Sequence, residues 1–162
     1  MPLKPLKIKE RLDKIKMEDN ARQALKIANN IFQGRWPEAE PIIMKDSRAA
    51  FLYAFHTLHG PWKEAEPYIM KNGDDAAGYA LHVLKQRWPE AEYNIKKSQN
   101  AVAYAYQIFK RRWPEAEPYI KKDPIQASSY ALNILKKPWP EAEPYIKLNR
   151  EAWSWYYHHF YK

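Results

Sequence analysis

Three histidines have the spacing that metal ligands take on helices. His56 and His59 are three residues apart, which places them on one face of a helix, and His82 follows His56 by 26 residues. A zinc site would complete such a pair with cysteine or a carboxylate, but the chain has no cysteine and no carboxylate falls on the same face. We therefore expect no metal site and no other cofactor.

Paired glutamates, such as Glu38 and Glu40, are the second arrangement that could support acid–base chemistry, and they occur in five copies. Two residues apart on a helix, the carboxylates of a pair diverge and cannot share a proton or flank a sugar ring. An active site also needs only one copy. With only four glycines, the chain has no glycine-rich phosphate loop. The sequence therefore predicts no enzyme and no small-molecule substrate.

The glutamate pairs belong to a phrase that recurs along the chain, as in "RWPEAEPYIKK" from residue 112. The tryptophans of the five copies are separated by 26, 26, 25 and 26 residues, and a fixed period of this size is typical of a solenoid. A second segment containing Tyr-Ala, such as Tyr53-Ala54, follows each phrase except the last. The tryptophans are Trp36, Trp62, Trp88, Trp113 and Trp139.

Each unit predicts two short helices. Pro37 suits the first position of a helix, and the charge order from Glu38 to Lys45 suits a helix dipole, so we expect a first helix over about 37–45. Pro41 removes an amide inside this helix and predicts a bend or an offset of one turn. The second helix of each unit carries the Tyr-Ala stripe, and Gly34 and Gly60 suit its C-terminal cap.

Neither helix is long enough to be stable alone, so the units must stack through tryptophan and the small alanine. The sequence predicts an all-α fold, a right-handed α-solenoid of about six hairpins in one domain over 9–162, after a basic arm at 1–8. Terminal units should be atypical because one face lacks a neighbour. The units are a degenerate 9–34, internal 35–60, 61–86, 87–111 and 112–137, and an aromatic cap at 138–162, in which Tyr156 aligns with the alanine position.

Tandem units of the W-P-E-A-E-P-Y-I type that alternate with Tyr-Ala segments resemble repeats of uncharacterised bacteriophage proteins. The resemblance covers 35–162 closely and 9–34 weakly, with Lys63 in place of the first proline and Tyr93-Asn94 in place of Pro-Tyr. It implies a helical repeat of viral origin and no catalytic residue. A protein with this origin would act in the host cytoplasm, and cytoplasm is also the default for a chain without cysteines, signal peptide or membrane-spanning segment.

Two rows of side chains are expected on the side of the second helices opposite the Tyr-Ala stripe. The residues of these rows can donate and accept hydrogen bonds or carry positive charge, which suits an extended binding surface for a host or viral protein. The competing interpretation is a solvated helix face. The polar row is His56, His82, Gln107, Asn133 and His158, and the cationic row is Lys85, Lys110 and Lys136.

The net charge of +8 is concentrated in residues 1–34 and in units 87–111 and 112–137. Basic residues at repeat spacing with aromatic neighbours such as Tyr106 could follow a phosphate backbone, so nucleic acid is the alternative partner. The competing interpretation is that these side chains cap helix C-termini and pair with the next glutamates. The residues concerned are Lys96, Lys97, Arg111, Arg112, Lys121, Lys122 and Lys137.

The last unit ends in aromatic residues, among them Trp153, Trp155 and Phe160. We expect them to close the last layer of the core, and a docking or dimerisation patch is the alternative.

Overall fold

The computed structural model describes Glu10 and residues 21–162, and within these residues the secondary structure is helical, with no strand. The expected basic arm and the start of the degenerate unit lie outside the described residues. Each unit has a short first segment, called the A helix, and a longer second one, called the B helix. The A helices are α3 (Glu40–Ile43), α5 (Glu66–Ile69), α7 (Glu92–Ile95, after the 3-10 turn η4, Pro89–Ala91), α9 (Glu117–Ile120) and α11 (Glu143–Ile146).

Most B helices consist of an α-helical part followed by one π-helical turn. The last one, α12 (Arg150–Tyr161), is α-helical throughout. The others are α2 (Ala21–Ile27) with η1 (Ala28–Phe32), α4 (Ser47–Tyr53) with η2 (Ala54–Leu58), α6 (Gly73–Tyr79) with η3 (Ala80–Leu84), α8 (Ala101–Tyr104) with η5 (Ala105–Phe109), and α10 (Pro124–Tyr130) with η6 (Ala131–Leu135).

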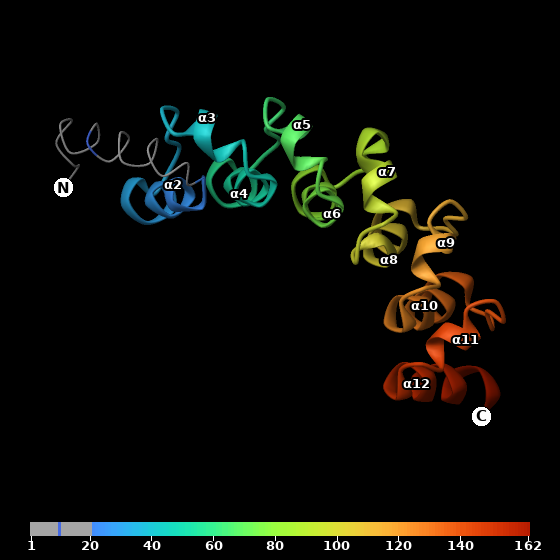
Figure 1. The fold of residues 1–162 in the computed structure, drawn as a ribbon. Coiled ribbons are helices and arrows are strands. Elements are labelled where there is room, and N and C mark those ends of the chain that lie inside the picture. The colour runs from blue at the N-terminus through green and yellow to red at the C-terminus, as the bar shows by residue number, and fades with distance from the viewer. Residues whose placement is uncertain (1–9, 11–20) are drawn as a thin grey trace.

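The hairpins follow one another along a curved path (Figure 1). The B helices lie along the inner side of the curve and the A helices along the outer side. Each B helix contacts the next, from α2 through α4, α6, α8 and α10 to α12. The inner face of the curve is therefore made of B helices, which the sequence left open.

The A helices are shorter than the sequence predicts. In unit 35–60, residues 37–39 form a tight turn in which the Ala39 amide donates to the Trp36 carbonyl at 3.0 Å, and α3 begins only at Glu40. Pro41 is the second residue of α3, where a missing amide costs nothing. The α-helix therefore begins three residues later than the range 37–45 predicts, and Pro41 lies in its first turn, which agrees with the expected offset and not with a bend.

The B helices begin and end with identifiable caps. Asp46 is an example at the start, since its side chain accepts a hydrogen bond from the Ala49 amide at 2.8 Å. At the other end the π-helical turn is followed by one residue in the left-handed region, with φ of 49–54°. Gly34 and Gly60 were predicted as these caps, but no glycine has a positive φ. The left-handed residues are Gln33, His59, Lys85, Lys110 and Lys136.

The core repeats from unit to unit, as the sequence predicts. The five repeat tryptophans are only 2–6 % exposed, and the alanines of the Tyr-Ala pairs are 0 % exposed. Each indole after the first packs on the tyrosine ring of the preceding unit, with centroids 5.1–5.4 Å apart. Tryptophan therefore couples neighbouring hairpins and supplies a large part of the apolar area that each hairpin buries.

A polar network inside each of the five units joins its A and B helices, and we call it the tyrosine clamp. The tryptophan amide donates to the tyrosine hydroxyl at 2.6–2.9 Å, and this hydroxyl donates to the second glutamate of Glu-Ala-Glu at 3.0–3.2 Å. The clamp tyrosines are 0 % exposed, and burial raises the pKa of Tyr53 to about 12. The clamp pairs are Tyr53–Glu40, Tyr79–Glu66, Tyr104–Glu92, Tyr130–Glu117 and Tyr156–Glu143.

The last unit differs in register from the sequence alignment. Because the Trp139 amide donates to the Tyr156 hydroxyl at 2.6 Å, Tyr156 is the clamp tyrosine, and its expected alignment with the alanine position is wrong. Tyr157 takes the alanine position instead, and Trp153 replaces another alanine that is buried in the internal units. The Trp153 ring stacks on Tyr156 at 5.6 Å and lies 5.7 Å from Tyr157. These large rings close the end of the core.

Candidate interaction surface

The half of each B helix that follows the clamp tyrosine, or Ile27 in the first B helix, has an unusual charge composition. These segments are 28–34, 54–60, 80–86, 105–111, 131–137 and 157–162, and we call them the B-helix ends. They contain all five histidines and six lysines and arginines, but none of the 19 acidic residues of the chain. Among residues 21–162, the carboxylates lie instead on the A helices, in the turns just before them and at the starts of the B helices. The B-helix ends are therefore a positively charged part of the B helices, which form the inner side of the curve in Figure 1.

The polar row is exposed on the B-helix ends, as predicted. His56, His82, Gln107 and Asn133 are all exposed and hold equivalent positions three residues after a clamp tyrosine. His158 is also exposed, but its equivalence to His56 is wrong, because the clamp register places His159 at that position.

The cationic row coincides with the left-handed caps. Lys85, Lys110 and Lys136 are exposed, have φ of 53–54° and, within the part of the chain that the structure describes, form no ion pair. The left-handed conformation costs a residue other than glycine roughly 1–2 kcal/mol, because its Cβ approaches the carbonyl oxygen. These three cations therefore stand at positions where the backbone itself favours glycine.

Two hollows lie between neighbouring B-helix ends and are formed by equivalent residues. Every lining residue of the second follows its counterpart in the first by 77 positions, which is three units. Lys110, Asn133 and Lys136 of the predicted rows meet in the second hollow, together with Arg111. The first, of about 480 Å³, is lined by Asn29, Gln33, Gly34, His56, Thr57 and His59, and the second, of about 520 Å³, by Tyr106, Lys110, Arg111, Asn133, Ile134 and Lys136.

The two hollows differ in charge. The Thr57 hydroxyl donates to the Asn29 side-chain oxygen at 2.6 Å across the first hollow, whose lining is neutral apart from its histidines. In the second, three cationic side chains share the lining with Tyr106, which is 57 % exposed. The second hollow therefore suits an anionic group beside an apolar or aromatic one.

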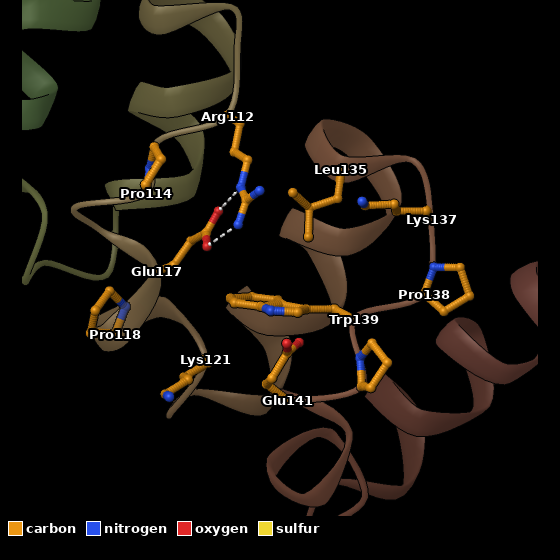
Figure 2. A pocket seen from close by; sticks show the side chains of 11 residues that line it. Arg112, Pro114, Glu117, Pro118, Lys121, Leu135, Lys137, Pro138, Trp139 and Glu141 are labelled. Atoms are coloured by element: carbon orange, nitrogen blue, oxygen red, sulfur yellow. Dashed lines mark hydrogen bonds and ion pairs between the residues drawn. The ribbon is translucent and has the colours of Figure 1, made fainter.

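A third hollow, of about 430 Å³, lies between α9 and the start of the last unit. Figure 2 shows Arg112 and Glu117 facing each other beside the indole of Trp139, with Lys137 and Glu141 near the same indole. The Arg112 guanidinium holds Glu117 with two bonds of 2.6 and 2.9 Å and lowers the pKa of that carboxyl. This hollow is nearly balanced in charge.

The residues expected to bind nucleic acid line different hollows or lie at the ends of A helices. Three of them, Arg112, Lys121 and Lys137, line the third hollow, and Arg111 lines the second. Lys96 and Lys97 lie at the end of α7, where their Nζ atoms are 4.9 and 3.5 Å from the centroid of the Tyr93 ring. Lys122 is exposed at the end of α9. The seven residues therefore do not share one hollow.

In the described part of the chain, no three histidines or acidic residues meet in an arrangement that could hold a metal ion. The same part has no helix with the length and apolarity needed to cross a bilayer. Comparison of the chain with protein-family models, curated proteins and solved structures gave no match.

Proposed function

We propose that the chain is a non-enzymatic scaffold or protein-interaction module that binds a host or viral protein along its inner face. The helices would form a right-handed α-solenoid of about six hairpins, and a bacteriophage origin, with action in the host cytoplasm, follows from the repeat resemblance. The observation that carries the proposal is the pair of hollows at equivalent positions of the B-helix ends. Repetition of a surface hollow along a concave face is how repeat proteins build extended binding surfaces.

The distribution of cations favours a protein over nucleic acid as the partner. A nucleic-acid surface needs a continuous track of free cations, because affinity comes mainly from phosphate contacts. Here Arg112 is held by Glu117, and Lys97 lies against the Tyr93 ring. The free cations of the inner face alternate with amides and apolar groups such as Gln107 and Ile134, a mixture that suits the side chains and backbone of a polypeptide.

Site-specific cross-linking tests this function. A photo-reactive phenylalanine analogue placed at Gln107, which is exposed on a B-helix end, should cross-link a discrete protein from infected or host lysate. The same analogue at Glu115, which is exposed just before α9, is the matched control and should not. The double variant Lys110→Glu/Lys136→Glu should abolish the cross-link.

Two results would reject protein binding at this face. One is equal cross-linking from both positions. The other is micromolar binding of single- or double-stranded oligonucleotides with a steep dependence on salt, which would establish nucleic acid as the partner.

A further inference from the structure

We propose that the partner contributes an extended acidic segment, in the polyproline II conformation, with a carboxylate at every third residue. This inference rests on the proposed function and specifies the chemistry of its partner. The segment would cross the B-helix ends of units 61–86, 87–111 and 112–137, and its carboxylates would meet Lys85, Lys110 and Lys136.

The sign of the charge comes from the composition of the B-helix ends. The three lysines lie at equivalent positions of successive units and have no acidic neighbour within the B-helix ends. Arg111, whose guanidinium lies 5.2 Å from the centroid of the Phe109 ring, adds a fourth cation to the lining of the second hollow. A negatively charged segment is therefore the complementary ligand.

The spacing comes from helix packing. Neighbouring packed helices are about 8–10 Å apart, so equivalent lysines recur at about this interval across the face. Polyproline II rises about 3.1 Å per residue with three residues per turn, which places every third side chain on one side at about 9 Å. In a β-strand, neighbouring side chains on the same side are about 6.6 Å apart, which does not match this interval. In a straight α-helix, side chains seven residues apart lie on one side at an interval of about 10.5 Å. A straight helix would, however, lose contact with a face that curves as in Figure 1.

The neighbouring residues supply what such a segment needs besides charge. Leu81, Tyr106 and Leu132 hold equivalent positions four residues before the lysines, and Tyr106 exposes 57 % of its surface. Apolar and aromatic side chains of this kind are the contacts that proline rings favour. Between the two rows, Gln107 and Asn133 are exposed amides, and polyproline II leaves its backbone groups free to pair with them.

The backbone at the three lysines provides an independent reason to assign them a ligand. Left-handed caps are normally glycine, and here three successive caps are lysine. Lysine also offsets the dipole at a helix C-terminus, so the experiment must separate a role in folding from a role in binding. Substitution by glycine does so, because glycine relieves the backbone and removes the cation in the same step.

The test uses the full chain and fluorescent peptides made of repeated Glu-Pro-Pro triplets, followed by fluorescence anisotropy at low and physiological salt. The triplet peptide should bind at least about tenfold more tightly than a peptide of the same composition with adjacent glutamates, because only the first matches the lysine interval. The variant Lys85→Gly/Lys110→Gly/Lys136→Gly should lose at least about tenfold in affinity without a fall in melting temperature. The matched control, Lys122→Ala, removes an exposed cation from the end of α9 and should bind within about twofold of the parent.

Equal affinity for the two acidic peptides would overturn the inference, and so would tighter binding of a helical peptide with glutamate at every seventh residue. No binding of any acidic peptide, together with a protein cross-link from Gln107, would reject the segment and leave the proposed function standing. Tighter binding of oligothymidylate than of the peptides would reject both.

Discussion

Replacing Tyr130 by phenylalanine removes one oxygen atom from the tyrosine clamp and leaves the aromatic ring in place. The Tyr130 hydroxyl accepts a hydrogen bond from the Trp113 amide at 2.7 Å and donates one to Glu117 at 3.1 Å. The ring centroid is 5.4 Å from that of Trp139, and phenylalanine keeps this contact. Any change in stability therefore reports the hydroxyl and not the packing.

The expected loss follows from the burial of the site. Tyr130 is 0 % exposed and Trp113 2 %, so water cannot replace the missing oxygen without opening the core. A buried amide left without an acceptor costs about 1–3 kcal/mol, and a hydrogen bond to a charged acceptor contributes about 1.5–3 kcal/mol. Because Glu117 keeps its bonds to Arg112, we expect Tyr130→Phe to lower the free energy of unfolding by about 2–4 kcal/mol. At about 2–4 °C per kcal/mol for a chain of this length, the melting temperature falls by roughly 4–16 °C.

Urea unfolding followed by tryptophan fluorescence and by circular dichroism measures this loss. The control is Tyr119→Phe, because Tyr119 is 39 % exposed and its ring, near Lys96 and Lys97, is kept by phenylalanine. Its effect should stay within about 0.5 kcal/mol. If Tyr130→Phe is equally mild, the Trp113 amide has another acceptor, and the clamp does not hold the two helices together.

Four further predictions concern the backbone and the clamp. At Gly73 a Cβ atom would lie 2.3 Å from the Asn94 carbonyl oxygen, so Gly73→Ala should cost about 1–3 kcal/mol in urea unfolding. Gly60→Ala, whose Cβ would have no atom closer than 3.9 Å, should be neutral or stabilising by up to about 1 kcal/mol, and a loss there would restore the glycine-cap interpretation. Lys110→Gly should raise the unfolding free energy by about 1 kcal/mol, whereas Lys110→Ala should not. Burial raises the pKa of Tyr53 to about 12 and raises the pKa of every other clamp tyrosine, so their contribution to stability is complete below about pH 10 and is lost as pH rises. Tyrosinate absorbance should then show the clamp tyrosines ionising only as circular dichroism is lost.

The all-α fold and the composition of its core could be predicted from the sequence because each unit repeats the same apolar residues at helical spacing. Trp113 and Tyr130 recur with their neighbours at a fixed distance, and residues that recur in this way must meet the same surroundings in every unit. The period says less about where a helix begins. Proline at position 37 and proline at position 41 both suit a helix start, and only the three-dimensional structure shows that the α-helix begins at the second.

The clamp was missed because its parts look ordinary in the sequence. Glu117 resembles any surface glutamate near a helix start, and the tyrosine ring of Tyr130 accounts for its burial without reference to its hydroxyl. The spacing contained a usable signal, since Trp139 precedes Tyr156 by 17 residues, as Trp113 precedes Tyr130. Alignment on this interval gives the register of the last unit, whereas alignment on Tyr-Ala fails there because the alanine has become Tyr157.

The candidate surface illustrates the same limit in a different way. The positions of the polar row could be predicted from the repeat period alone, because side chains that face away from the buried stripe are exposed. His56, Gln107 and Asn133 are exposed for this reason. The conformation at Lys110 could not be found, since lysine carries no preference for the left-handed region and glycine stands beside the cap in two units. What determines that conformation is the preceding π-helical turn, in which the Lys110 amide donates to the Ala105 carbonyl at 2.8 Å. A wide turn of this kind is uncommon and often marks a functional site. Its recurrence in five units, ending three times in lysine, is the reason to look for the partner at the B-helix ends.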